Sequence, residues 1–283
     1  MSLPFILVPV GVDDVALDAC LAALEQSTAA ASAVWLADDS QAGPRGQAVI
    51  EHWLATTRMR AEYTRRPRAI GEVAHLDEML TACGDADVVV LAPDAIPLPG
   101  WLQHLSDCLA RDASIATATP WSNAGEVSAW PRPGEINPQP LEVMRLAQAC
   151  AAMPPLHPEL PSAVAHAVLL RGSARRKAGG LDVHSYGSWY AALIDLSLRM
   201  SGLGWRNVLC ENAFVARVGE GQPFDGDLDV LATRWPAWPA RLASFLMADP
   251  LQAQREHLQQ LFVQAIMPTA QRDLFGRGGD VPG

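Results

Sequence analysis

The sequence has no run of about 18 apolar residues, the minimum length for a helix that crosses a membrane. The chain enters an apolar segment at Phe5 without a basic region before it, so a secretory signal peptide is not expected either. These absences predict a cytoplasmic protein without a transmembrane segment. Peripheral association with the inner membrane surface is the alternative that they leave open.

Positive charge and clustered cysteines are also scarce. The 283 residues hold 21 Lys and Arg against 31 Asp and Glu, a formal net charge of −10. Because no basic stripe can neutralise phosphates along a duplex, nucleic acid is not an expected partner. The five cysteines lack the spacing of a metal site, and most lie in apolar segments, where a reduced thiol packs as a small hydrophobe.

Two nucleotide-binding signatures are missing as well, the Gly-x-Gly-x-x-Gly motif after the first apolar run and the P-loop Gly-Lys-Ser/Thr. What the chain does have is apolar runs that recur about every 27 residues over its first 120 residues, with amphipathic helical patterns between them. The runs are Phe5 to Val10, Ala33 to Ala37, Ala61 to Tyr63, Val88 to Leu91 and Ile115 to Thr119. This alternation predicts parallel βαβ units with helices on both faces of the sheet.

The chain changes character after residue 120. A proline-rich polar segment predicts a functional loop, and a mixture of strands and helices follows it. We expect strands over Ala163 to Leu170, Trp205 to Cys210 and Ala213 to Ala216, and helices around Ala191 to Met200 and Gln252 to Ile266. The predicted organisation is a βαβ half (1–120), a second half of the same domain (121–233) and a helical tail (234–283). The tail is expected to pack on the domain, with a homo-oligomer or membrane-surface contact as the alternative.

Acidic residues follow two of the predicted strands. The segment DVVVLAPDAIPLPGWL runs from a buried strand directly into Asp94, and Asp38 and Asp39 follow the second strand. Open α/β sheets bind their ligands beyond the carboxyl ends of their strands, so these carboxylates are candidate site residues. The alternative is a structural role, with Asp38 and Asp39 forming a turn and helix cap.

Five segments in order carry a family resemblance: ILVPVGVDDVALDACLAAL, VWLADDSQ, VVVLAPDAIPLPGWL, IATATPWSNAGEVSAWP and LRMSGLGWRNVLCENAFVARVG. Together they resemble the family 2 inverting glycosyltransferases, particularly bacterial enzymes of O-antigen and surface-polysaccharide assembly. The resemblance spans about Pro4 to Leu251. It implies the GT-A fold, a Rossmann-like mixed and mostly parallel sheet flanked by helices, here with a C-terminal helical extension.

The resemblance also implies a donor site for a UDP-, dTDP- or GDP-sugar. Pro9, Val10 and Gly11 would line the base, and Asp38 and Asp39 would lie near the uracil or ribose, where a carboxylate accepts charge-assisted hydrogen bonds. These five residues are the expected nucleoside contacts.

A divalent metal, Mn²⁺ or Mg²⁺, is the cofactor that the family holds with two acids separated by one residue. The corresponding residues here are Ala92, Pro93 and Asp94, so the first acid is missing. Asp94 is the expected metal ligand, with a turn residue as the alternative. Arg217 stands where many relatives carry a histidine, and its guanidinium is expected to contact the donor diphosphate.

Relatives place the general base, which deprotonates the acceptor hydroxyl, in a Gly-Glu-Glu-x-Asp-like segment at a helix start. The segment YGSWYAALIDLSLR lacks both glutamates, which leaves Asp195 as the candidate base. The alternative is that Asp195 anchors the helix through Arg199 at i+4.

The acceptor pocket is expected to use aromatic faces that stack on sugar rings and polar groups that select hydroxyl positions. The candidates are Trp121, Asn123, Trp189, His166 and His184, and the two histidines are also the substitutes for the missing one. The predicted function is transfer of a sugar with inversion from a nucleotide donor to a glycan, lipid-linked or protein acceptor. A nucleotide- or glycan-binding scaffold without turnover is the alternative, because several family acids are absent.

Overall fold

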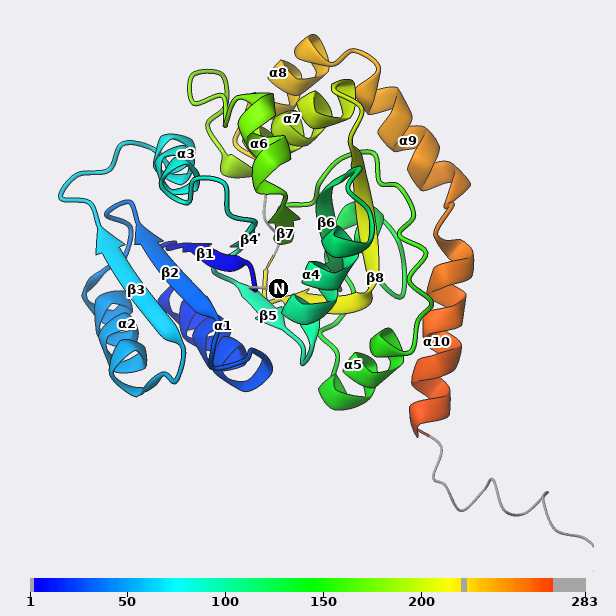
Figure 1. Cartoon of the computed structure of the whole chain (residues 1–283), viewed down its shortest axis with the longest axis horizontal. Helices are drawn as coiled ribbons and strands as arrows, with labels where there is room; N and C mark the ends of the chain where they lie inside the picture. Colours follow the sequence, from blue (N-terminus) through cyan, green and yellow to red (C-terminus); the bar gives the residue numbers. More distant parts are fainter. Residues whose placement is uncertain (1–2, 220–222, 267–283) are drawn as a thin grey trace, which may run out of the picture.

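The computed structural model describes residues 3–219 and 223–266, and it is built around one mixed sheet of eight strands (Figure 1). The strands are β1 (Phe5–Pro9), β2 (Ala33–Asp38), β3 (Arg60–Arg65), β4 (Val88–Leu91), β5 (Ala95–Pro97), β6 (Ile115–Trp121), β7 (Ala167–Leu170) and β8 (Arg206–Arg217). Their order is β3-β2-β1-β4-β7-β6-β8-β5. The first four strands in this order are parallel, β7 runs antiparallel to both its neighbours, and β6 pairs with β8 in parallel.

Helices cover both faces of this sheet. They are α1 (Asp14–Ser27), α2 (Pro44–Thr56), α3 (Glu72–Ala82), α4 (Trp101–Arg111), α5 (Val143–Ala151), α6 (Gly172–Ala178), α7 (Trp189–Gly202), α8 (Asp227–Arg234), α9 (Trp238–Ala248) and α10 (Gln252–Ile266), with a short 3₁₀ turn over Glu126–Ser128. The apolar sides of α1, α2 and α4 pack on one face, and those of α3, α6, α7 and α8 pack on the other.

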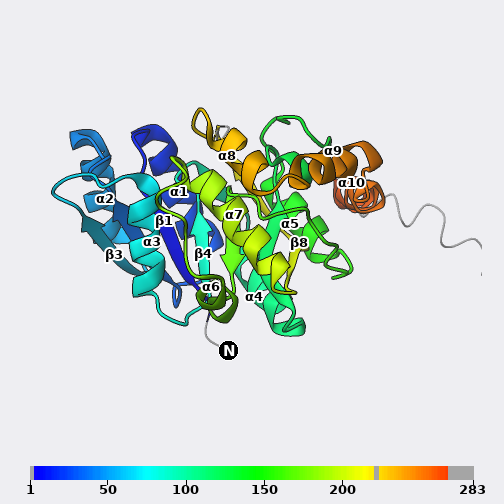
Figure 2. The same cartoon turned by 90° about the horizontal axis from the view of Figure 1, so that it is seen from above.

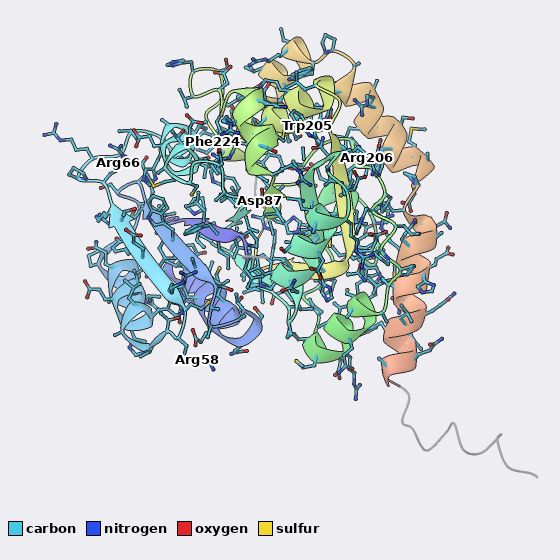
Figure 3. All side chains as sticks on the ribbon, in the orientation of Figure 1. Arg58, Arg66, Asp87, Trp205, Arg206 and Phe224 are labelled. Atoms are coloured by element: carbon cyan, nitrogen blue, oxygen red, sulfur yellow. The ribbon has the colours of Figure 1, made fainter. Side chains whose placement is uncertain are left out.

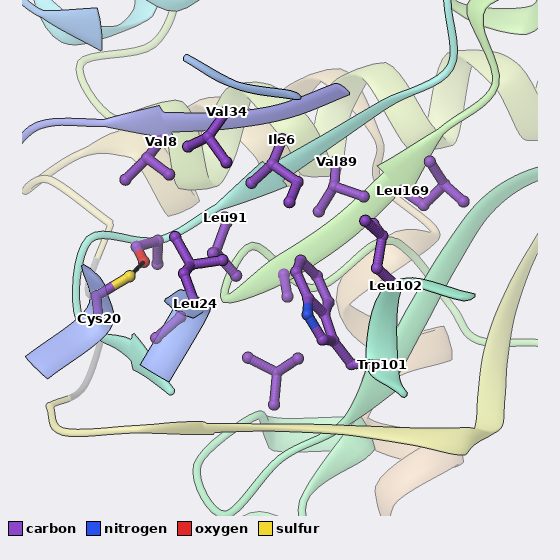
Figure 4. Close-up of a cluster of buried hydrophobic side chains, with 14 of the residues drawn as sticks. Ile6, Val8, Cys20, Leu24, Val34, Val89, Leu91, Trp101, Leu102 and Leu169 are labelled. Atoms are coloured by element: carbon purple, nitrogen blue, oxygen red, sulfur yellow. Dashed lines mark hydrogen bonds between the residues drawn. The ribbon is translucent and has the colours of Figure 1, made fainter. Parts of the chain in front are cut away.

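Alternation along the buried strands produces these two layers. Ile6 and Val8 of β1 join the cluster under α1 and α4, where Trp101 is fully buried (Figure 4), whereas Leu7 points to the opposite cluster under α3 and α7. A strand buried on both faces has no polar side, which explains why β1 and β4 read as continuous apolar runs.

The tail lies at the end of the molecule opposite to α2 (Figure 2), and its helix α10 packs against α5. Arg255 of α10 is 5% exposed and donates hydrogen bonds to the backbone carbonyls of Val127 (2.9 Å) and Ala129 (2.8 Å). Its guanidinium also lies 5.5 Å from the ring centroid of Trp121, within the range of a cation–π contact. The tail therefore holds the loop that follows β6.

The mixed α/β fold with flanking helices and a helical extension is the one that the sequence predicts. Three details differ. The two expected strands after residue 205 form one strand, β8; the expected strand over Ala163 to Leu170 is the shorter β7; and β5 pairs with the end of β8 without a strand pattern of its own. No helix in the described ranges is long and apolar enough to cross a membrane.

Candidate functional site

A cavity of about 830 Å³ opens at the carboxyl ends of β1, β2 and β4. Parallel strands end at the same edge of the sheet, so residues from distant parts of the sequence meet there. The cavity wall includes Pro9, Val10, Gly11, Asp13, Ala37, Asp39, Glu72, His75, Ala92, Pro93, Asp94, Gly187, Trp189, Arg217, Gly219 and Phe224. Seven residues that the sequence predicts for the donor and acceptor sites are among them: Pro9, Val10, Gly11, Asp39, Asp94, Trp189 and Arg217.

Asp94 and Arg217 form an ion pair in this wall. The Nε of Arg217 lies 3.1 Å from Oδ2 of Asp94, and its second terminal nitrogen lies 3.0 Å from Oδ1. The two side chains are only 17% and 8% exposed, so water screens the pair weakly. The pairing of β5 with β8 sets this geometry, because it places Ala95 opposite Arg217.

Asn123 fixes the backbone of Arg217. Its Oδ1 accepts the amide of Arg217 at 2.7 Å, and its Nδ2 donates to the carbonyl of Arg217 at 3.2 Å. A second donor to the same carbonyl is Nε2 of Gln139, at 3.0 Å. Asn123, expected to contact the acceptor, thus holds Arg217 in place instead.

The residues around Asp94 do not fit a divalent metal. Both carboxylate oxygens of Asp94 are bound by Arg217, and the residue two positions before it is Ala92. Across the described part of the chain, no group of three or more His, Cys, Asp or Glu side chains is placed to hold an ion. Mg²⁺ and Mn²⁺ sites are built from oxygen ligands, and here one engaged carboxylate stands alone.

The two neighbouring acids after β2 have different positions. Asp38 is fully buried outside the cavity, where its carboxylate accepts hydrogen bonds from Arg65 (2.5 Å), the hydroxyl of Tyr63 (2.8 Å) and the amide of Gln41 (2.6 Å). Asp39 faces the cavity and binds the amides that precede α3, including that of Gly71 at 2.9 Å. Of the expected pair, Asp38 has the structural role and only Asp39 lines the cavity.

Asp195, the expected base, does not line the cavity. It is 0% exposed in the middle of α7, where its carboxylate accepts hydrogen bonds from Arg199 (2.8 Å), Trp235 (2.9 Å) and Tyr186 (3.2 Å), and Arg234 lies 3.3 Å away. An acceptor hydroxyl cannot reach a carboxylate enclosed by four donors. These contacts favour the helix-anchoring alternative, since the side chains that enclose Asp195 come from α7, from the loop before it and from the end of α8 with the residue that follows.

The remaining acceptor candidates fall outside the cavity as well. Trp121 is fully buried in the cluster beneath the tail, and His184 is exposed in the loop before α7. His166 is 0% exposed, and within the described residues neither ring nitrogen has a hydrogen-bond partner. Burial and then the charge of Arg217 lower the pKa of His166 to about 3, so the ring is neutral. Among all the acceptor candidates, only Trp189 lines the cavity.

The sequence reasoning missed two glutamates near the site. Glu72 lines the main cavity and accepts the amide of Trp189 at 2.9 Å, while burial raises the pKa of its carboxyl. Glu126 lines a smaller cavity of about 100 Å³ together with Tyr190 and Arg217. Glu126 keeps part of its surface exposed, but desolvation by the residues around its carboxyl raises its pKa, and the nearby hydroxyl of Tyr190 opposes that rise. Glu126 follows β6 closely, as Asp94 follows β4, and this signal could have identified it.

Arg217 lines both cavities, so the two spaces lie against the same residue. The guanidinium of Arg217 can bind an anionic ligand group in the large cavity. The small cavity leaves room for a small polar group. The arrangement suits a site for two ligands.

Solved structures similar to this chain share its fold at low sequence identity. GalNAc-T7 in complex with UDP, GalNAc and Mn²⁺ has a TM-score of 0.60 at 10% identity, over 97% of this chain and 58% of that chain. The mannosyltransferase PcManGT from Pyrobaculum calidifontis, with GDP-Man and Mn²⁺, has a TM-score of 0.52 at 13% identity over 96% of this chain and 75% of its own. TarS 1–349 from S. aureus, in complex with UDP-GlcNAc, has a TM-score of 0.57 at 10% identity over 92% and 71%.

This chain thus spans less than two thirds of the GalNAc-T7 chain and about three quarters of the other two. No protein-family model and no curated protein sequence matches it. At these identities the likeness concerns the fold and not the activity. The protein has the GT-A glycosyltransferase fold.

Proposed function

We propose that the protein is a glycosyltransferase that moves a sugar from a UDP-, dTDP- or GDP-linked donor to an acceptor hydroxyl. The observation that carries the proposal is the cavity of about 830 Å³ at the strand ends of a GT-A fold, with Asp39 at one side and Arg217 at the other. Its volume suits a nucleotide-sized ligand. The similar solved structures hold UDP, GDP-Man or UDP-GlcNAc.

The donor is proposed to lie across this cavity. The nucleoside contacts Pro9, Val10 and Gly11 at the end of β1, and Asp39 offers a carboxylate to base N–H or ribose hydroxyl groups. Gly11 and Pro93 lie close together at this end of the cavity, because a Cβ on Gly11 would lie 3.3 Å from Pro93. The diphosphate then reaches Arg217.

We propose Glu126 as the general base in place of Asp195. It borders the small cavity that shares Arg217 with the donor cavity, so an acceptor hydroxyl there is proposed to face the sugar of the donor, on the side away from the diphosphate. A volume of about 100 Å³ holds about three water molecules, enough for a hydroxyl group and its neighbouring carbons but not for a whole glycan. Trp189, in the wall of the large cavity, is proposed to offer an aromatic face to the rest of the acceptor.

In this mechanism the acceptor oxygen attacks the anomeric carbon from the face opposite the diphosphate, and the configuration inverts. The C–O bond to the diphosphate breaks as the new C–O bond forms, the nucleoside diphosphate leaves with the electron pair, and the hydroxyl proton passes to Glu126. A raised pKa, the direction of the shift at Glu126, makes a carboxylate a stronger base. The proposed acceptor is a glycan of surface-polysaccharide assembly, following the sequence resemblance, with lipid-linked and protein acceptors as further members of the test panel.

The test is a panel of UDP-, dTDP- and GDP-sugars, scored for donor hydrolysis and for transfer to glycan, lipid-linked and peptide acceptors. Loss of a general base lowers turnover by about 10²- to 10⁴-fold, which we expect for Glu126→Gln. Glu51→Gln on the exposed side of α2 is the matched control and should leave turnover unchanged. Full activity of Glu126→Gln would refute the base assignment.

A second function is favoured by one observation, the single engaged acid at Asp94 where relatives hold two. It is a GT-A domain that binds a nucleotide or glycan without turnover. Tight nucleotide binding with neither hydrolysis nor transfer across the panel would favour this function over the enzyme.

A further inference from the structure

We propose that the guanidinium of Arg217 takes the place of a divalent ion at the donor diphosphate, so that nucleotide binding needs no metal. This inference rests on the proposed function, because it concerns the same cavity. It replaces the metal role expected for Asp94 with a different one: Asp94 orients the guanidinium.

The first argument is that Asp94 is already engaged. Arg217 contacts both carboxylate oxygens at 3.0 and 3.1 Å, and the amide of Gly219 lies 3.3 Å from Oδ2. A metal ion that shared these oxygens would lie beside the guanidinium, and the two cations would repel each other. If Arg217 left them instead, its side chain, only 8% exposed, would be a buried charge without its partner, which is strongly unfavourable.

The second argument is that Arg217 cannot move easily. Its amide and carbonyl are both held by Asn123, at 2.7 and 3.2 Å, and Gln139 donates to the same carbonyl. The next amide, that of Val218, donates to the carbonyl of Asp94 at 3.0 Å. These contacts hold the backbone of Arg217, and Asp94 holds its guanidinium. Little conformational entropy is therefore lost when the guanidinium binds a phosphate.

The third argument is the chemistry of the guanidinium. It carries five N–H donors in a planar fork, and its contacts with Asp94 at 3.0 and 3.1 Å use two of them. In the described part of the chain, Asp94 is the only side-chain acceptor that this guanidinium contacts. The three remaining N–H groups suit the oxygens of a diphosphate, which arginine binds with both charge and geometry.

The other acids of the cavity wall do not assemble around Asp94 to make a metal site. Asp13 caps α1 by accepting the amides of Val15 and Ala16, both at 3.0 Å. Asp39 binds the amides before α3, and Glu72 binds the amide of Trp189. Each carboxylate therefore has backbone donors of its own.

The experiment is calorimetric titration of the full chain with UDP, dTDP and GDP, in EDTA and again in saturating Mn²⁺. We expect the same dissociation constant in both conditions for the nucleotide that binds. Arg217→Met should weaken binding by about 10- to 100-fold, the effect of losing a hydrogen bond to a charged group, and Arg217→Lys should restore part of it.

Asp94→Asn separates the two roles of Asp94 by the condition in which its effect is seen. If Asp94 only orients Arg217, the asparagine oxygen still accepts one hydrogen bond from the guanidinium, and nucleotide affinity changes by the same factor in EDTA and in Mn²⁺. If Asp94 binds a metal, affinity falls in Mn²⁺ alone and the response to Mn²⁺ is lost. Asp94→Asn also conserves volume, so it remains informative if Arg217→Met does not fold.

Arg58→Met is the matched control for Arg217→Met. Arg58 is 71% exposed and pairs with Glu25 at 2.8 Å, and it lies far from Phe224 of the cavity wall (Figure 3). Nucleotide affinity that rises about tenfold or more with Mn²⁺ in the wild type would overturn the inference while supporting the proposed function. Failure of every nucleotide to bind, with or without metal, would overturn both.

Discussion

Replacing Asp195 with asparagine separates a structural role from a catalytic one. The carboxylate is 0% exposed, with Oδ2 at 2.8 Å from Arg199 and Oδ1 shared by Tyr186, Trp235 and Arg234. Asparagine keeps one acceptor oxygen and turns an NH₂ group toward donors, so at least one hydrogen bond to a charged group is lost. We expect Asp195→Asn to lower the free energy of unfolding and to leave the chemistry of the folded protein unchanged.

The size of the effect follows from the burial of the partners. A lost charged hydrogen bond costs about 1.5 to 3 kcal/mol, and a donor left unsatisfied adds about 1 kcal/mol. Arg234 is 39% exposed, so water compensates for its lost contact with Asp195, and this contact adds no free energy to the sum. The sum is about 2.5 to 4 kcal/mol, or a fall in Tm of about 5 to 10 °C for a chain of this size.

The assay is thermal unfolding followed by circular dichroism, combined with turnover measured well below the Tm of the variant. Asp18→Asn, which changes an exposed aspartate of α1, is the matched control and should leave both values unchanged. An unchanged Tm together with a fall in turnover of about 100-fold or more would refute the structural role and restore Asp195 as the base.

Two further predictions concern buried groups outside the site. Gly172→Ala should destabilise the protein by several kcal/mol or prevent folding, because the new Cβ would collide with the backbone carbonyl of Asp85. Gly202→Ala meets open space and should not destabilise, and chemical denaturation compares the two. Burial raises the pKa of Glu211 from 4.5 to about 7, so the folded state binds the extra proton and the free energy of unfolding falls as pH rises between these values. Glu211→Gln should flatten that slope, and an unchanged slope would contradict this origin.

The first half of the fold is predictable because its strands, apart from the edge strand β3, are largely buried and its helices have one apolar side. The same pattern locates the strand ends, and with them Asp39 and Asp94. Sequence does not tell which of two adjacent acids faces the cavity, because that depends on Tyr63 and Arg65 of a neighbouring strand, which bind Asp38.

Asp195 shows the same limit at longer range. Its bond with Arg199 at i+4 can be read from the sequence, since such pairs meet on one helix face. Its other partners cannot: Trp235 lies 40 residues further along the chain and reaches Asp195 only after α8 packs on α7. The role of Asn123 cannot be predicted from the sequence for the same reason, because its partner Arg217 is 94 residues away.

The position of the proposed base, Glu126, depends on a contact with Arg255 of the distant helix α10. Arg255 binds the carbonyl of Val127, the neighbour of Glu126, from 128 residues further along the sequence. Contacts of such separation form late in folding. During synthesis, the loop that carries Glu126 therefore gains its support only after α10 has been made, so a nascent chain with a finished donor cavity would still lack a positioned base.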